Sequence, residues 1–374
     1  MPLLHKIAAA VVVVAVALGL WLPDERPGAP SAGAARAGDR EPVPVGPAGK
    51  ARPGERPGAS QPGPRPTAAA SAVGTVGPAT PAAAAASANE LGQVPVLMYH
   101  RIVAKPTLTL DRTIKEFREE LVRLATGGYV PITAGEFVSG RINVPAGKHP
   151  VVLTFDDSTP EQFALDPQGR PKPDTAVGIL QDVARQYPGF RPTATFYLNK
   201  ELFGLAGQEA AGLRWLQQNG FELGNHTLTH KDLSQLSKKD VQKEIGDIEA
   251  KIVSLTGRNT TTLAYPFGSE PDKRSWAEKK DGSYSFQGVF LAGWKPSESP
   301  YAEDFDRLAI ARVRSEGKIK ENDCTRFCST AWLEELEKNP ATRYTSDGDP
   351  NTITFPRSEE DRLAKRLRGN GRIY

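Results

Sequence analysis

Cysteine occurs only twice in the 374 residues of this chain, as Cys324 and Cys328, and no histidine follows His230. Two cysteines without a later histidine make a metal site in this part of the chain the weaker interpretation. In an exported protein the two cysteines are able to form a disulfide, which is the favoured interpretation.

An excess of charge of one sign is also missing. The chain has 47 basic and 44 acidic residues, a net charge of +3 at pH 7. The basic residues are scattered, apart from a C-terminal run near Lys365 that is typical of a solvated helix face. We therefore expect no nucleic-acid partner.

Large apolar side chains are nearly absent from residues 23–89, where Ala, Pro and Gly dominate. Such a segment cannot bury enough apolar surface to offset its chain entropy. Residues 23–90 are therefore predicted to be a disordered linker that leads to a folded domain.

The N-terminus, in contrast, is apolar. A continuous apolar run over residues 7–22 is typical of a signal peptide or a short membrane anchor, which we assign to residues 1–22. No cysteine follows the run, which excludes a lipoprotein anchor. The nearest small-residue cleavage site lies farther on, at residues 32–34, so an uncleaved anchor is favoured over a cleaved signal peptide. Either form predicts an extracytoplasmic protein, membrane-anchored or secreted.

The remaining residues, 91–374, have a length suited to one large α/β domain. Apolar runs predict strands at residues 94–99, 151–155, 193–198, 221–224, 261–265, 288–291 and 308–313. Helical spacing predicts helices at residues 116–125, 175–187, 212–218 and 238–255, with further helices near 331–338 and 359–367. This alternation implies a parallel sheet, either closed into a barrel or doubly wound.

Two adjacent carboxylates, Asp156 and Asp157, directly follow the strand predicted at residues 151–155. The carboxyl end of a parallel strand is where barrel enzymes place their catalytic groups. An Asp-Asp pair alone more often caps the next turn, so it gains weight only beside a second feature.

His226 and His230 are that second feature, and they follow the strand predicted at residues 221–224. A spacing of four residues brings two imidazoles to one face of a helical turn, where they are able to grip one cation. Two histidines and one carboxylate make a metal site with open positions for water and substrate. The second carboxylate is then placed to act as a base.

Residues 154–157 (Thr-Phe-Asp-Asp) and 226–230 (His-Thr-Leu-Thr-His) resemble the first two motifs of the polysaccharide deacetylase family, the NodB-homology carbohydrate esterases. Residues 94–101 also resemble the start of its poly-N-acetylglucosamine deacetylase branch. The resemblance covers roughly residues 94–314. It implies a distorted (β/α) barrel, with a catalytic domain over residues 91–320 and a C-terminal extension over 321–374 that packs on it.

By this resemblance Asp156 is the general base, whereas Asp157, His226 and His230 bind a divalent metal, zinc or alternatively cobalt. The implied activity is metal-dependent hydrolysis of N-acetyl groups on an extracellular or cell-wall polysaccharide that contains N-acetylglucosamine. The implied partners are an acetylated glycan and, if the N-terminal segment is uncleaved, the membrane. We expect the protein to be a monomer.

Residues 264–268 (Ala-Tyr-Pro-Phe-Gly) resemble the core of the family's third motif. This makes Tyr265, Pro266 and Phe267 candidates for substrate binding. Many members carry an arginine just before this core that pairs with the base, but here the preceding residues are apolar. Three arginines later in the chain are candidates for the missing partner: Arg307, Arg312 and Arg314.

The fifth motif of the family usually supplies a histidine as general acid, and residues 308–312 contain none. His100, at the end of the first predicted strand, is our candidate substitute, and a histidine packed at the barrel rim is the competing interpretation. Trp294 is a candidate for lining an acetyl pocket or stacking on a sugar, and core packing is its alternative.

Three other functions stay open. A catalytically silent relative that binds glycans would account for the missing arginine and the missing late histidine. An O-acetyl esterase acting on a xylan-type polymer would use the same site chemistry. A metallohydrolase acting on other amides or on phosphoesters is disfavoured by the third-motif residues.

Overall fold

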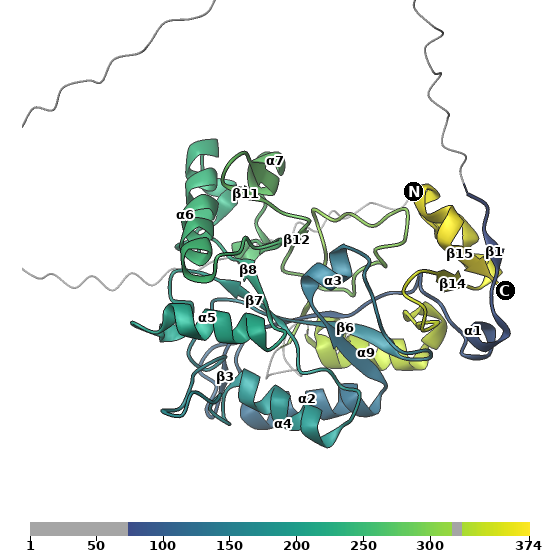
Figure 1. Ribbon diagram of the computed structural model, residues 1–374, viewed down its shortest axis with the longest axis horizontal. Coiled ribbons are helices and arrows are strands. Elements are labelled where there is room, and N and C mark those ends of the chain that lie inside the picture. The colour runs from purple at the N-terminus through teal and green to yellow at the C-terminus, as the bar shows by residue number, and fades with distance from the viewer. Residues whose placement is uncertain (1–73, 316–323) are drawn as a thin grey trace, which may run out of the picture. The chain divides into compact units, whose positions relative to one another are not determined.

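The computed structural model describes residues 74–315 and 324–374, and all of them belong to one compact unit (Figure 1). The segment predicted as an anchor, residues 1–22, and most of the predicted linker lie outside the described residues. In the described part, no helix combines the length and the apolar character that crossing a membrane requires.

A parallel sheet of eight strands forms the centre of the domain (Figure 1). The strand order is β12-β9-β8-β7-β6-β2-β13, and β5 pairs with β6 beside this path. The bounds are β2 Val96–Tyr99, β5 Tyr129–Ile132, β6 His149–Phe155, β7 Thr195–Leu198, β8 Glu222–Asn225, β9 Thr262–Ala264, β12 Gly288–Phe290 and β13 Val313–Arg314. The long strand β6 is buried at every position, as expected for a parallel strand covered on both faces.

A single segment, residues 307–314, joins the two edges of this sheet. Ile310 bridges to Phe290 of β12, and Val313 and Arg314 then pair with β2. The sheet thereby curls into a distorted barrel, which confirms the predicted fold class. The predicted strand at residues 308–313 needs correction, because the segment changes partner midway and only its end forms regular pairing.

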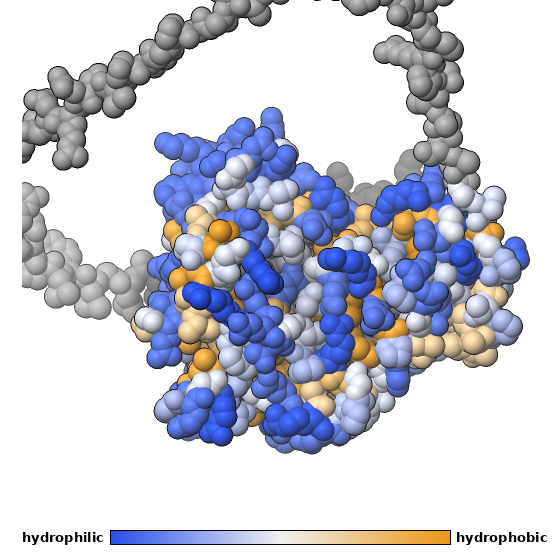
Figure 2. Space-filling view, viewed as in Figure 1, coloured by the Kyte–Doolittle hydropathy of each residue, from blue (hydrophilic) through white to orange (hydrophobic). Residues whose placement is uncertain are grey.

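Four helices pack outside the sheet: α2 Ile114–Thr126, α4 Ala176–Gln186, α5 Glu209–Gln218 and α6 Lys238–Thr256. Their apolar stripes face inward; in α6 the buried positions include Val241, Ile245 and Ile252. Where α4, α5 and α6 lie in Figure 1, the surface in Figure 2 is largely hydrophilic. The helical spacing in the sequence therefore predicted these helices correctly.

Shorter elements complete the barrel. The helices are α3 Ala134–Val138, α7 Ser275–Glu278, η1 Leu202–Gly204, η2 Leu233–Gln235, η3 Pro266–Gly268 and η4 Pro340–Thr342. Two small strand pairs are β3 Ile102–Val103 with β4 Arg112–Thr113, and β10 Lys279–Lys280 with β11 Tyr284–Ser285. The residues just before β4 and helix η3 lie beside the carboxyl end of the sheet, where the candidate site is found.

The end of the predicted linker is ordered, which corrects its boundary at residue 90. Residues 74–90 contain β1 Gly77–Pro78 and α1 Pro81–Ala85. Strand β1 pairs with β15 Gly371–Ile373, which also pairs with β14 Ile353–Phe355. The short segment folds despite its composition because backbone pairing to the C-terminus supplies the contacts that its small side chains lack.

Glu90 fastens this N-terminal segment to the C-terminal extension. Its buried carboxylate accepts hydrogen bonds from the backbone N–H of Thr354 at 2.8 Å and the hydroxyl of Tyr344 at 3.0 Å. Ser299 donates to the Glu90 carbonyl at 2.6 Å. The segment before the barrel is therefore part of the folded unit.

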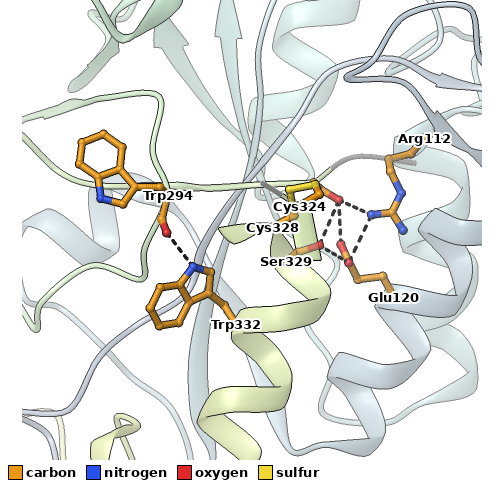
Figure 3. The surroundings of a disulfide bond; sticks show 8 residues. Arg112, Glu120, Trp294, Cys324, Cys328, Ser329 and Trp332 are labelled. Carbon is orange, nitrogen blue, oxygen red and sulfur yellow. Dashed lines mark hydrogen bonds and ion pairs between the residues drawn. A yellow bond between two sulfur atoms is a disulfide. The ribbon is translucent and has the colours of Figure 1, made fainter. Parts of the chain in front are cut away.

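The C-terminal extension begins with a disulfide between Cys324 and Cys328, at α8 Cys324–Phe327 and α9 Ser329–Lys338 (Figure 3). This pairing confirms the favoured interpretation of the two cysteines. Ser329 donates to buried Glu120 of α2 at 2.6 Å, and Glu120 also pairs with Arg112. These contacts join the start of the extension to helix α2 of the barrel.

Helix α9 confirms the helix predicted at residues 331–338, but the helix predicted at 359–367 is wrong. That stretch forms two 3₁₀ helices, η5 Arg357–Arg362 and η6 Lys365–Asn370. Leu363 between them is buried and forms an antiparallel bridge with Ala302. This extended residue interrupts the helix.

Candidate active site

A cavity of about 650 Å³ opens at the carboxyl ends of the parallel strands. Strands β2, β6 and β8 and the segment joining the sheet edges all end at it. The residues of both sequence motifs line it: Asp156, Asp157, His226 and His230. The fold therefore brings together side chains that lie 70 positions apart in the sequence.

The two carboxylates follow β6 at a sharp change in the backbone. Asp157 and Ser158 have φ angles of 75° and 46°, in the left-handed region that is costly for residues with a side chain. The Gln162 amide stabilises the turn by donating to the carbonyls of Asp156, at 2.5 Å, and His100, at 3.0 Å. The turn lets both neighbouring carboxylates face one cavity, although adjacent strand residues point to opposite sides.

The two histidines lie on a loop after β8, which corrects the predicted helical turn. Thr227 and His230 have positive φ angles of 64° and 56°. The rings of His226 and His230 meet edge to face, with 5.0 Å between their centroids. The loop's left-handed residues, and not helical spacing, therefore bring the two imidazoles together.

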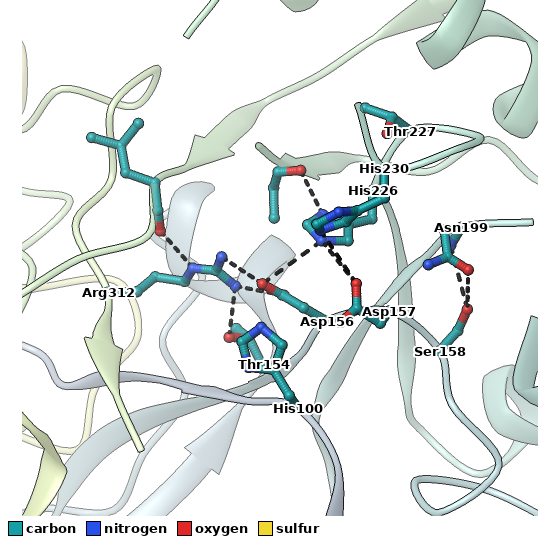
Figure 4. Close-up of polar contacts among 12 residues, drawn as sticks. His100, Thr154, Asp156, Asp157, Ser158, Asn199, His226, Thr227, His230 and Arg312 are labelled. Carbon is teal, nitrogen blue, oxygen red and sulfur yellow. Dashed lines mark hydrogen bonds and ion pairs between the residues drawn. The ribbon is translucent and has the colours of Figure 1, made fainter. Parts of the chain in front are cut away.

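Asp157, His226 and His230 converge on one point (Figure 4). Asp157 Oδ1 lies 3.6 Å from His226 Nε2 and 3.4 Å from His230 Nε2. Tetrahedral ligands about 2.1 Å from a zinc ion lie about 3.4 Å from one another, so these separations suit a cation. Among the described residues, no other group of histidine, cysteine and acidic side chains has this arrangement.

His226 is prepared to be a ligand by its surroundings. Its Nδ1 lies 2.8 Å from the carbonyl of Ala264, so Nδ1 carries the proton and Nε2 carries the lone pair. This Nε2 is buried and has no hydrogen-bond partner among the described residues. Burial lowers the pKa of His226, although Asp156 and Asp157 pull it upward, and the ring is therefore neutral. The residues fit a divalent cation.

Asp156 is held by a buried arginine. Arg312 Nη1 and Nη2 donate to the two carboxylate oxygens at 2.7 and 2.8 Å (Figure 4). The exposed fractions of the two side chains are 0% for Arg312 and 3% for Asp156. Burial alone would raise the pKa of Asp156, but the Arg312 guanidinium holds it well below its usual value. Asp156 is therefore ionised and fixed in orientation.

Arg312 belongs to the segment that joins the sheet edges, and this position brings its side chain next to Asp156. Its Nε donates to the carbonyl of Leu291 at 2.6 Å, which orients the guanidinium toward β6. Of the other two candidate arginines, Arg307 pairs with Glu278 and Arg314 lines the cavity. All three were candidates from the sequence for the partner of Asp156, and the closure of the barrel places Arg312 against it.

His100 lines the cavity from the end of β2. Its Nδ1 is buried without a hydrogen-bond partner among the described residues. Burial lowers the pKa of His100, although Asp156 and Asp157 act in the opposite direction. A neutral imidazole therefore stands beside the carboxylates, where it is able to accept and return a proton.

The third-motif residues form a turn at the cavity. Phe267 has a φ of 60° and a side chain that is 67% exposed, and its ring lies 4.6 Å from the ring of His230. Tyr265 is buried and lines the cavity, whereas Pro266 is buried in the turn and does not line it. Two of these three candidate residues therefore face the site.

The sequence did not reveal one part of the rim, residues 107–111. Asp111 accepts the N–H groups of Thr107 and Leu108 at 2.8 and 2.9 Å and a two-pronged pair from Arg101. These bonds hold Leu108, which is 61% exposed, in the cavity wall. No motif marks this segment, and only its tertiary position identifies it.

Trp294 does not line the cavity, which argues against an acetyl pocket, whereas stacking on a sugar stays a prediction. It is 57% exposed, so the alternative of core packing is wrong as well. Its backbone bridges to Val313, and its carbonyl accepts the indole N–H of Trp332 at 2.7 Å (Figure 3). These two contacts fix the residue on the surface, outside the cavity lining.

The chain resembles known proteins over this same region. Residues 143–285 match the family model described as polysaccharide deacetylase. YxkH of Bacillus subtilis strain 168, provisionally named a polysaccharide deacetylase, is 24% identical over 226 residues, 59% of this chain and 71% of YxkH. The peptidoglycan-N-acetylmuramic acid deacetylase PdaC of the same strain is 30% identical over 131 residues, which cover 35% of this chain and only 24% of PdaC.

Among solved structures, the deacetylase PplD of Streptococcus pyogenes, in complex with acetate, is 21% identical, with a TM-score of 0.48. The match covers 61% of this chain and 94% of PplD. The family model spans both carboxylates, both histidines and the aromatic turn of the site. Over residues 143–285 the chain is therefore similar to the polysaccharide deacetylase family.

Proposed function

We propose that the protein removes N-acetyl groups from a polysaccharide that contains N-acetylglucosamine, outside the cytoplasm. The observation that carries this proposal is the pairing of an ionised, arginine-held Asp156 with the neighbouring set of Asp157, His226 and His230 in one open cavity. Amide hydrolysis by a metal-activated water needs a general base beside a set of metal ligands, and this cavity contains both.

Asp157, His226 and His230 would hold the metal ion, for which zinc or cobalt suits the nitrogen and oxygen donors. A cation bound there supplies Lewis acidity toward the acetyl carbonyl and toward a nearby water. Asp156 does not join this ligand set in our assignment, because Arg312 engages both of its oxygens. It acts as the base that takes the proton of the attacking water.

The third-motif turn would stabilise the negative charge that develops on the acetyl oxygen. The N–H of Tyr265 donates to Phe290, that of Gly268 donates to Tyr265, and Pro266 has none. This leaves the N–H of Phe267 as the donor of the turn that is available for a developing oxyanion.

His100 is our candidate for the group that protonates the leaving amine. Asp156 is a weak base because of Arg312, so the proton that it takes must be passed on before the leaving amine departs. The neutral His100, in the same cavity, is our candidate for carrying that proton to the amine nitrogen. Replacing His100 with asparagine should lower kcat and leave metal binding intact.

The rim suits a sugar polymer. Exposed Leu108 and Phe267 offer apolar surface to the C–H faces of sugar rings, and the cavity of about 650 Å³ has room for more than one acetamido group. We propose an N-terminal membrane attachment through residues 1–22, a monomeric enzyme and a cell-wall or surface polymer as substrate. The alternative of a silent glycan-binding relative loses its main support, because Arg312 fills the place of the missing arginine.

The direct test measures acetate released from N-acetylglucosamine oligomers and from peptidoglycan by the zinc- or cobalt-loaded protein, with Asp156→Asn as the inactive control. Release by the parent and none by the control is expected. An O-acetylated xylan, supplied in parallel, separates an O-acetyl esterase from an N-deacetylase. Zinc uptake without acetate release from any of the three substrates would contradict the proposal.

A further inference from the structure

The loop that carries the two histidines has an unusual shape for its sequence. Thr227 and His230 both adopt left-handed backbone angles, with φ of 64° and 56°, although neither is a glycine. Such residues persist only where the surroundings hold them in place. His230 is also half-buried, and its ring contacts Asp157 and the rings of His226 and Phe267.

Helix α6 supplies the contacts that hold this loop. Glu244 of α6 accepts the Thr229 N–H on Oε2 at 2.8 Å and the Thr229 hydroxyl on Oε1 at 2.8 Å. The carbonyl of Glu244 accepts the Leu228 N–H at 2.9 Å. One residue thus binds two consecutive N–H groups directly before His230.

The Glu244 contact is a built feature and not a surface accident. The residue is only 6% exposed, and Lys231 Nζ lies 3.4 Å from Oε1, which offsets the cost of burying the carboxylate. Charged acceptors of this kind form hydrogen bonds about twice as strong as neutral ones. Loss of the charge would loosen the loop at Thr229, the residue directly before His230.

We propose that Glu244 is a positioning residue for the metal site: it fixes the backbone at Thr229 and so presets His230 toward Asp157 and His226. The inference rests on the proposed metal site and adds to it a residue that contacts neither metal nor substrate. The amide of a glutamine would keep an oxygen for the Thr229 N–H, but it would lose the charge and turn its nitrogen toward Lys231.

The test is the zinc affinity of the full-length protein, measured by calorimetry after chelator treatment, for the wild type and Glu244→Gln. We expect Glu244→Gln to bind zinc about 10- to 100-fold more weakly, the usual effect of removing a group that orients a metal ligand. With cobalt as the probe, the visible absorption bands should shift, because the His230 ligand is no longer held in one direction.

The matched control is Asp247→Asn, on the same helix, since Asp247 pairs with Lys243 and not with the loop. Its zinc affinity should stay within about twofold of the wild type, as expected for a largely exposed pair. Thr229→Val provides a milder variant that removes only one donor to Glu244, and a loss of about threefold to tenfold is expected. It keeps the test open if Glu244→Gln fails to fold.

Thermal unfolding of the metal-free proteins distinguishes positioning from mere support of the fold. If Glu244→Gln and Thr229→Val lower the melting temperature but bind zinc as tightly as the wild type, the inference is wrong and the proposed metal site stands. If the wild type binds no zinc, the proposed function fails and the inference falls with it.

Discussion

Arg312 and Asp156 are both buried and pair with each other, so a change in one acts on both. Arg312→Met would leave an uncompensated carboxylate and should destabilise the fold by about 3–5 kcal/mol. Asp156 would then take up a proton, which removes the base and abolishes most of the deacetylase activity. Urea unfolding and acetate release measure the two effects.

Arg307→Met is the comparison for that variant, because Arg307 pairs with Glu278 at a half-exposed position. It should change the free energy of unfolding by no more than about 1 kcal/mol and keep full activity. Equal losses in both variants would refute the special role of the Arg312 pair.

His226 Nε2, which has no hydrogen-bond partner among the described residues, leads to a second prediction about a single side chain. His226→Gln should remove stoichiometric zinc, measured by elemental analysis, because no other described residue can complete the set with Asp157 and His230. His149→Gln is the control, since His149 is bonded to the carbonyl of Tyr344 in the C-terminal extension. Retention of zinc by His226→Gln would exclude this ligand assignment.

The sequence predicted the site residues unevenly, for reasons visible in single side chains. Asp156 and Asp157 follow an apolar run, and His226 and His230 form a local motif, so short patterns were enough. Arg312 was named only as one of three arginines, because its partner lies 156 positions earlier and barrel closure joins them. The role of Leu108 in the rim could not be predicted, since it depends on the turn around Asp111.

Among the elements, the N-terminal segment before the barrel should be sensitive to pH. Burial and the charge of Asp347 raise the pKa of Glu90 to about 8, against the hydrogen bonds from Thr354 and Tyr344. An unfolded glutamate has a pKa near 4.5, so between pH 4.5 and 8 the folded state binds a proton that the unfolded state does not. The free energy of unfolding therefore falls as pH rises through this window, by at most about 1.4 kcal/mol per unit.

Glu90→Gln should flatten this dependence, because the amide does not titrate. The measurement is urea unfolding at pH 5 and pH 8 for the wild type and the variant. Glu360→Gln, at a partly exposed ion pair with Arg368, should keep the wild-type slope. A slope unchanged by Glu90→Gln would show that other groups cause it.

Elements with strong periodicity were predictable, and those held by tertiary contacts were not. Helices α2 and α6 carry apolar stripes, and β6 is a continuous apolar run. Strand β5 Tyr129–Ile132 was not predicted, and its Pro131 is unusual in a strand; among the described residues β5 pairs with β6 alone, so its other edge tolerates the proline. The histidine loop was taken for a helical turn because its spacing is helical, whereas contacts from Glu244 set its actual path.

For the whole molecule, the ordered start of the domain predicts where a truncated protein remains stable. A chain that begins at residue 91 loses β1, α1 and Glu90, and with them the buried contacts to the C-terminal extension. It should melt several degrees below a chain that begins at residue 74. Equal melting temperatures would mean that residues 74–90 only rest on the domain.

The pairing of β1 with β15 also has a consequence in time. Gly77 lies opposite Arg372, nearly 300 residues later in the chain. At a synthesis rate of about 5–20 residues per second, β1 waits roughly 15–60 s for its partner strand to be made. Near the end of that interval the barrel strands have been made but the small terminal sheet has not. The N-terminal strand β1 therefore pairs only after the last residues have been made, and a chain that stops short of residue 371 leaves β1 without β15.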